Sequence, residues 1–146
     1  MNKMSETANR ASDNVAELRT KAKDDQIAAF LEMRLLELSP GYAKVAIRLK
    51  PKYQNFHGVI FGGIIMALAD QAFAYASNSL VYPSVASQFN THFIAGAEVN
   101  DELTAECRVL KSGRRVGISE IAITNQNGKL IAKATGTTIP LAEPSC

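Results

Sequence analysis

The sequence predicts an α+β protein in which an antiparallel sheet wraps around one long central helix. An apolar run without a polar stripe, residues 62–76, is typical of a helix enclosed by other structure. After residue 85, segments that alternate between apolar and polar residues are separated by turn signals, as in antiparallel strands. The 146 residues are enough for one domain with its own core.

Turn signals divide the chain into a definite order of elements. Ser39-Pro40-Gly41 predicts a hairpin turn near the start, and Asn127-Gly128 predicts a tight hairpin near the end. Before residue 80 the predicted elements are a helical segment over 5–32, strands over 33–38 and 42–49, a loop over 51–61 and the central helix, ending near 77–79. The strands predicted after it cover residues 85–94, 103–111, 115–125 and 130–139.

Residues 1–25 are polar and charged and predict a helical extension, so that the domain itself covers residues 26–146. The first residues contain no apolar stretch of the kind found in secretion signals, and we expect a cytoplasmic protein. The net charge of +2 argues against a nucleic-acid-binding groove. The long apolar run 59–76 is interrupted by glycines, Asp70 and Gln71, and therefore predicts a core helix and not a membrane span.

Cysteine and histidine are too few and too far apart to indicate a metal centre. Cys107 lies in a predicted strand and Cys146 at the chain end, without the spacing of a disulfide framework. His57 and His92 lack neighbouring ligands of the kind that metal sites use. We therefore expect a protein that needs neither metal nor cofactor.

Asp70 is the most informative residue because it is the lone acid in the apolar run of the central helix. Burying an ionised carboxylate without a partner is costly, unless its pKa rises or hydrogen-bond donors reach it. An acid in such a position indicates a role in chemistry. The alternative interpretation is an aspartate that caps a neighbouring loop or pairs with an arginine.

A polar, glycine-punctuated loop runs directly into the start of this helix, from Asn55 through His57 and Gly58 to Gly62-Gly63. Glycines allow the backbone to approach a ligand, and the first N–H groups of a helix can bind an oxyanion. Such donors, together with an acid further along the helix, indicate acyl transfer or hydrolysis.

Spacing along the helix predicts that the site is shared between two chains. Gly62 and Asp70 are eight residues apart, which places them about 12 Å from each other along one helix. They cannot both reach one carbonyl group within a single chain. A two-fold pairing of two such helices would bring the glycine of one subunit to the acid of the other.

The order of elements and the central motif resemble the hotdog fold and, within it, the PaaI-like branch of the acyl-CoA thioesterases. Many members carry Asn-x-x-Gly-x-x-His-Gly-Gly, followed seven residues later by the catalytic aspartate. Here the pattern reads Asn55, Gly58, Phe61, Gly62, Gly63 and Asp70. Segments 69–79, 85–90 and 113–117 are also similar to PaaI-type sequences. The resemblance covers residues 26–140.

The resemblance implies a role for each motif residue. Asp70 would be the nucleophile or general base, the backbone N–H of Gly62 would polarise the thioester carbonyl, and Asn55 would orient that carbonyl or the attacking water. In the family the aspartate and the glycine come from different subunits, which agrees with the spacing argument. We therefore expect a homodimer, pairing further into a dimer of dimers.

The sequence departs from the family pattern at two positions. Phe61 stands where many relatives have histidine, and His57 is the candidate to take its place; the alternative is that His57 only hydrogen-bonds the loop. Some relatives have a serine or threonine at the position of Ala86, next to Ser87. The residues expected to contact the substrate here are Gly63, Phe61 and Ser87.

Coenzyme A carries phosphates that need cations, and relatives bind its nucleotide end near the turn that follows residue 111. Lys111, Arg114 and Arg115 cluster there and are expected to hold phosphate groups, the alternative being a solvated turn. Four aromatic residues are candidate walls of an acyl pocket, although aromatic residues in such positions usually belong to the core: Phe73, Tyr75, Phe89 and Phe93.

Three functions fit these residues. The first is hydrolysis of a small, medium or aryl acyl-CoA thioester, which needs a carboxylate, an oxyanion site and water. The second is non-catalytic acyl-CoA binding or sensing, which gains little from a buried acid. The third is a hydratase or dehydratase, which would need a histidine paired with an acid and would use His57. Asn55, Gly62 and Asp70 together favour the thioesterase.

Overall fold

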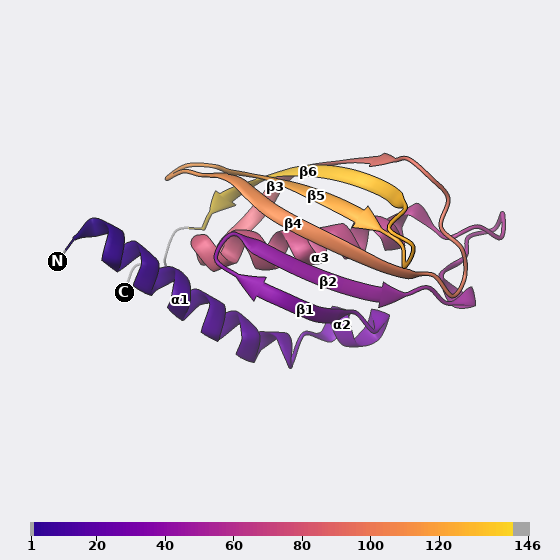
Figure 1. The fold of residues 1–146 in the computed structure, drawn as a ribbon, viewed down its shortest axis with the longest axis horizontal. Coiled ribbons are helices and arrows are strands. Elements are labelled where there is room, and N and C mark those ends of the chain that lie inside the picture. Colours follow the sequence, from indigo (N-terminus) through magenta and orange to yellow (C-terminus); the bar gives the residue numbers. More distant parts are fainter. Residues whose placement is uncertain (1, 142–146) are drawn as a thin grey trace.

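A six-stranded antiparallel sheet curves around one long helix (Figure 1). The computed structural model describes residues 2–141. The helices are α1 (Lys3–Ala22), α2 (Gln26–Leu31), the 3₁₀ helix η1 (Pro51–Tyr53) and the central α3 (Gly62–Leu80). The strands are β1 (Arg34–Ser39), β2 (Tyr42–Arg48), β3 (Ser84–Phe93), β4 (Glu102–Ser112), β5 (Gly117–Thr124) and β6 (Leu130–Pro140). Across the sheet they lie in the order β1-β2-β4-β5-β6-β3. An antiparallel sheet around a central helix is the α+β architecture that the sequence predicts.

The elements lie close to their predicted positions, and the clearest differences fall at two breaks. The segment predicted as helix over 5–32 forms two helices, because Asp25 leaves the helical conformation and caps α2, accepting from the N–H of Ala28 at 3.0 Å. Strand β5 begins two residues later than predicted. The N–H of Gly113 donates to the carbonyl of Val116 at 2.9 Å and closes a turn there.

One face of α3 forms the centre of the core. Its most deeply buried apolar residues are Leu68, Ala69, Ala72, Phe73 and Ala76. On the opposite side, Met66, Asp70 and Ala74 recur every four residues and are exposed; we call these three residues the exposed strip of α3. The expectation that the helix, with Asp70, is buried on nearly all sides is therefore wrong for the single chain. Small apolar residues make the sequence look enclosed, yet within residues 2–141 no element covers this strip.

Helix α1 lies against β1 and the end of α3. Leu18 is buried there. The Nδ2 group of Asn14 donates to the carbonyl oxygen of Ser79 at 3.3 Å, and Arg19 donates to the carbonyl oxygen of Leu38 at 2.7 Å. The helical extension therefore contacts the rest of the fold. The division of the chain after residue 25 stays a prediction.

Strands β1 and β3 form the two edges of the sheet. β1 has six residues and lies beside α1, whereas β3 has ten residues, most of them exposed. Within residues 2–141, β3 pairs with β6 on one side and with no strand on the other. An edge with unpaired N–H and C=O groups is a template for pairing with another chain.

Residues 2–141 contain neither a metal-binding cluster nor a membrane-spanning helix. No three His, Cys, Asp or Glu side chains in residues 2–141 are arranged to hold a metal ion. No helix in that range has the length and apolar character needed to cross a membrane. Metal-free and cofactor-free chemistry stays a prediction of the sequence.

Candidate active site

The loop before α3 is a small hairpin whose shape depends on Asn55 and Gly58. The Oδ1 atom of Asn55 accepts from the N–H groups of His57 at 2.9 Å and Val59 at 3.4 Å. Gly58 has a φ of +76°, a conformation that favours glycine. Oδ1 is therefore occupied within the loop, and the Nδ2 group of Asn55, which is a donor, remains for a ligand.

The start of α3 carries two backbone donors without acceptors in residues 2–141. Phe61 precedes the helix without a side-chain cap, and the N–H groups of Gly62 and Gly63 form no hydrogen bond in this range. Each of these glycines lies against an exposed aromatic ring, which a side chain at that position would displace. A Cβ atom on Gly63 would overlap the Phe61 ring, and one on Gly62 would lie 3.1 Å from the Phe93 ring. These N–H groups are suited to binding an oxyanion.

Asp70 lies two turns into the same helix, on the exposed strip. Although the side chain reaches the surface, the atoms packed around it desolvate the carboxylate and raise the pKa of Asp70 above its usual value. Within residues 2–141 the carboxylate caps no loop and pairs with no arginine. The helix is continuous from Gly62 to Leu80, so the separation of about 12 Å between Gly62 and Asp70 applies.

His57 extends from the loop and is exposed. Its ring stacks on Phe56 with 4.1 Å between ring centroids, and only its backbone N–H bonds to Asn55. A hydratase would need a histidine paired with an acid, and His57 forms no ion pair with an acid among residues 2–141. Its replacement of the family histidine at Phe61 stays a prediction.

The cations expected to bind phosphate lie at the far end of α3. Lys111, Arg114 and Arg115 are exposed and line one open depression at the turn between β4 and β5. No carboxylate in residues 2–141 lies within 4.0 Å of them. This turn adjoins Ser77 and Val81, at the end of α3 opposite to the glycines. One chain therefore does not bring these cations close to the glycines at the start of α3.

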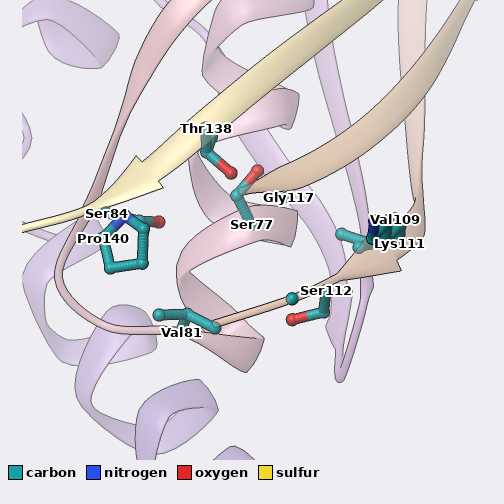
Figure 2. Close-up of a pocket in the computed structure, with 10 residues that line it drawn as sticks. Ser77, Val81, Ser84, Val109, Lys111, Ser112, Gly117, Thr138 and Pro140 are labelled. Carbon is teal, nitrogen blue, oxygen red and sulfur yellow. The ribbon is translucent and has the colours of Figure 1, made fainter. Parts of the chain in front are cut away.

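A small pocket of mixed polar and apolar lining lies between this basic turn and the end of α3 (Figure 2). Ser77, Ser84 and Thr138 contribute hydroxyl groups to its walls. Its volume of about 10 Å³ has room for roughly one water molecule, far less than a thioester requires. This pocket is a feature of packing beneath the turn and not a substrate site.

Ser87 lies in a β-bulge on the free edge of β3. The pairing with β6 shifts by one residue between Ala86 and Gln88, so that Ser87 is the extra residue. Its Oγ donates to the carbonyl oxygen of Thr137 at 3.3 Å. Within one chain, this side chain is not brought to the start of α3.

The candidate aromatic walls separate into two groups. Phe93 lines an apolar pocket that opens beside Gly62. Phe73 and Tyr75 are buried, and Phe89 packs on Phe73 with 5.7 Å between ring centroids. Core packing therefore accounts for these three.

Sequence reasoning missed a polar cluster that joins the start of α2 to α3. The Oδ2 atom of Asp25 accepts from Gln71 Nε2 at 2.5 Å and from the Tyr75 hydroxyl at 3.0 Å. Burial alone would raise the pKa of Asp25, but hydrogen bonds from the Ala28 N–H, Gln71 and Tyr75 outweigh it and lower that pKa. Burial and the neighbouring Asp25 raise the pKa of Tyr75. The only sequence signal was an aspartate before a short helix, because its partners lie 46 and 50 residues away.

Comparison with known proteins identifies the family. Residues 57–132 match the Thioesterase superfamily. The acyl-coenzyme A thioesterase PaaI of Escherichia coli is 33% identical over 114 residues, which cover 78% of this chain and 81% of that protein. The structure of the E. coli PaaI protein has a TM-score of 0.84 at 29% identity, covering 93% of this chain and 96% of that chain. A hypothetical thioesterase protein of Streptococcus pneumoniae, in a crystal structure with coenzyme A, has a TM-score of 0.77 at 25% identity and covers 86% of this chain and 98% of that chain. The chain therefore belongs to the thioesterase superfamily, as a PaaI-like thioester hydrolase with the hotdog fold.

Proposed function

We propose that the protein hydrolyses a small, medium or aryl acyl-CoA thioester to the free acid and CoA. One helix carries two N–H groups, at Gly62 and Gly63, that form no hydrogen bond within residues 2–141, and an acid with a raised pKa, Asp70; this observation carries the proposal. The E. coli relative is named an acyl-coenzyme A thioesterase, and the S. pneumoniae structure is with coenzyme A. These names support CoA thioesters as the substrate class.

In the proposed reaction Asp70 acts as nucleophile or general base. Its carboxylate either attacks the thioester carbonyl, forming an anhydride that water then hydrolyses, or removes a proton from the attacking water. The C–S bond breaks and CoA leaves as the thiol. The N–H of Gly62 binds the oxyanion, and Asn55 donates to the carbonyl or the water. These groups and water supply all of the chemistry.

The proposed site is shared within a homodimer. The exposed strip of α3 and the free edge of β3 lie on neighbouring elements, and both lack a covering element within residues 2–141. Antiparallel pairing of two β3 edges would place the two α3 helices side by side in opposite directions. Gly62 of one subunit would then approach Asp70 of the other. Further pairing of dimers stays an expectation.

In this arrangement the nucleotide end of CoA lies on the subunit that supplies Asp70. From Asp70 to Leu80 the helix rises about 15 Å, and the basic turn adjoins that end of the helix. The cations proposed to bind the phosphates are Lys111, Arg114 and Arg115. Each site would take its acid and its phosphate-binding turn from one subunit, and Gly62 with Asn55 from the other.

The remaining proposed contacts surround the thioester. Gly63 lacks a side chain and lets the substrate approach the helix start, where the Phe61 ring packs against it. Ser87, on the free edge of β3, would reach the site across the subunit interface. His57, at the exposed loop, is proposed to assist the attacking water where relatives use the histidine replaced by Phe61.

A panel of acyl-CoA thioesters tests the proposed function, with the release of free thiol as the readout. We expect the purified protein to hydrolyse at least one short-chain, medium-chain or aryl acyl-CoA. Binding of acyl-CoA by calorimetry, without thiol release from any member of the panel, would contradict the proposal and favour a binding module.

A further inference from the structure

An apolar pocket opens beside the start of α3. Its walls are Val59, Ile60, Gly62, Ile65, Phe93 and the segment 94–97. Its volume of about 480 Å³ lies within the range of about 300–1,000 Å³ that is usual for small-molecule sites. All of the side chains that line it are apolar, and three of its walls are glycine or alanine from the connection after β3.

We infer that this pocket binds the acyl group of the substrate, that this group is uncharged and apolar, and that Phe93 limits its length. The inference rests on the proposed function and adds the class of acyl group. Gly62 links the pocket to the proposed oxyanion site, because it forms a wall of the pocket and also carries the N–H proposed to bind the carbonyl oxygen. An acyl chain attached to that carbonyl therefore starts at the pocket.

The lining decides which acyl groups are accepted. A second carboxylate on the acyl group would lose its hydration in the pocket without meeting a cation, which is strongly unfavourable. An alkyl chain or an aromatic ring gains from the same desolvation. No cation is among the residues that line this pocket, and the cluster at the β4–β5 turn lies at the other end of α3.

Phe93 is placed to set the depth of the pocket. It is the last residue of β3, its side chain is 53% exposed, and its ring lies against the backbone of Gly62. Removing the ring opens space directly beside the proposed oxyanion site. Gly96 offers the opposite change, because a Cβ atom there would meet nothing within 4 Å.

Three substitutions that change the volume of the pocket test the inference. We measure kcat/KM for the parent, Phe93→Ala, Phe93→Leu and Gly96→Leu on saturated thioesters from acetyl-CoA to palmitoyl-CoA. Phe93→Ala should shift the preferred chain length upward and raise kcat/KM on the longer chains, relative to the parent's best substrate, about tenfold. Gly96→Leu should shift the preference toward shorter chains. Phe93→Leu should give an intermediate shift, and it serves in place of Phe93→Ala if that variant does not fold.

Phe30→Ala is the matched control, since it removes a ring that is 73% exposed on α2 and outside the pocket. Its chain-length profile should equal that of the parent. Succinyl-CoA should be hydrolysed at least about tenfold less well than butyryl-CoA. Unchanged profiles in the pocket variants, or efficient hydrolysis of succinyl-CoA, would overturn the acyl pocket and leave the thioesterase proposal standing. A parent that hydrolyses no acyl-CoA would overturn both.

Discussion

At the scale of single residues, Asp70 connects stability with the proposed chemistry. Desolvation raises its pKa, so the folded state holds the proton more tightly than the unfolded state does. As the pH rises through this raised pKa, the ionised carboxylate destabilises the folded protein. The chain thus keeps an acid whose ionised form lowers the stability of the fold, which is common for catalytic acids and bases.

We predict that Asp70→Asn removes most of the thioesterase activity without loss of stability. Losing a nucleophile or base lowers kcat/KM by roughly 10²-fold or more. The thermal midpoint at neutral pH should be equal to or higher than that of the parent, because the amide carries no desolvated charge. In the parent, kcat/KM should rise with pH through a pKa displaced upward from 3.8, as the carboxylate forms. Thiol release and thermal unfolding by circular dichroism measure these effects.

Asp13→Asn provides the control, because Asp13 is an exposed acid on α1. It should leave both activity and thermal midpoint unchanged. An Asp70→Asn variant that hydrolyses its best substrate within about threefold of the parent would remove Asp70 from the mechanism.

The elements that carry the candidate residues were predictable from the sequence, but the exposure of these residues was not. The spacing of Asn55, Gly62 and Asp70 follows from the motif, and the loop and helix start have the predicted form. The exposure of Asp70 could not be predicted, because an alanine-rich helix has the same apolar pattern whether its cover comes from its own chain or from another. The pocket at Phe93 and the connection after it could not be predicted, because apolar residues in a sequence can equally belong to the core.

At the scale of elements, the β4–β5 turn is predicted to bind the nucleotide end of CoA. Changing Arg114 and Arg115 together to alanine should raise KM for a CoA thioester severalfold and leave kcat nearly unchanged, since phosphate contacts are equal in ground and transition states. The effect should weaken at high salt as screening increases. Steady-state kinetics at two ionic strengths measure both parameters.

Arg10→Ala combined with Lys23→Ala gives the same change of net charge at exposed positions of the N-terminal segment, and should leave KM unaffected. A short thioester without the nucleotide tests where the arginines act. Equal losses on the short and the complete substrate would show that the double change damages the fold or the acyl site, and would remove the phosphate role.

The cluster of Asp25, Gln71 and Tyr75 is predicted to hold α2 against α3. Asp25→Ala removes the cap of α2 and leaves the buried Tyr75 hydroxyl without its acceptor, and should lower the free energy of unfolding by about 1–3 kcal/mol at pH 7. The folded-state pKa of Asp25 is lowered, so this contribution is present above the unfolded value of 3.8 and lost as the pH falls through the lowered pKa. The difference between parent and variant should therefore shrink in acid. Urea unfolding at several pH values measures it.

Asp24→Ala is the control for this cluster, because Asp24 is the exposed neighbour of Asp25. It should change the free energy of unfolding by less than about 0.5 kcal/mol. A parent and an Asp25→Ala variant that unfold at the same urea concentration at pH 7 would show that the cluster does not stabilise the protein.

The elements themselves were predictable because local signals agree with the fold. Alternating residues and turn signals place the strands, and the Gly-Gly pair marks where α3 begins. The break after α1 was missed because the helix-favouring composition continues across it. α1 ends at Ala22, and Asp25 then caps α2 and bonds to Gln71 and Tyr75 of α3, which are distant in sequence. The late start of β5 likewise depends on one backbone hydrogen bond within its turn.

At the scale of the whole molecule, two uncovered features lie on one side of the part of the chain that the structure describes. The exposed strip of α3 and the free edge of β3 lie on neighbouring elements, whereas the other edge of the sheet has α1 beside it. A second chain related by two-fold symmetry would cover both features at once. In the proposed dimer, the partner would supply the cover that the apolar pattern of α3 suggested.

Mixing two inactive variants tests this shared site. Gly62→Pro removes the proposed N–H donor and suits the first position of a helix, where proline is favoured, and the extended backbone of Phe61 tolerates a following proline. Dimers of Gly62→Pro with Asp70→Asn would contain one intact site, with glycine from the Asp70→Asn subunit and acid from its partner. After unfolding and joint refolding in equal amounts, half of the dimers are hybrids with one good site of two, so activity should return to about one quarter of the parental value. If glycine and acid acted within one chain, every hybrid would lack a working site and mixing would restore nothing. A parent that is monomeric by light scattering and fully active would exclude the shared site altogether.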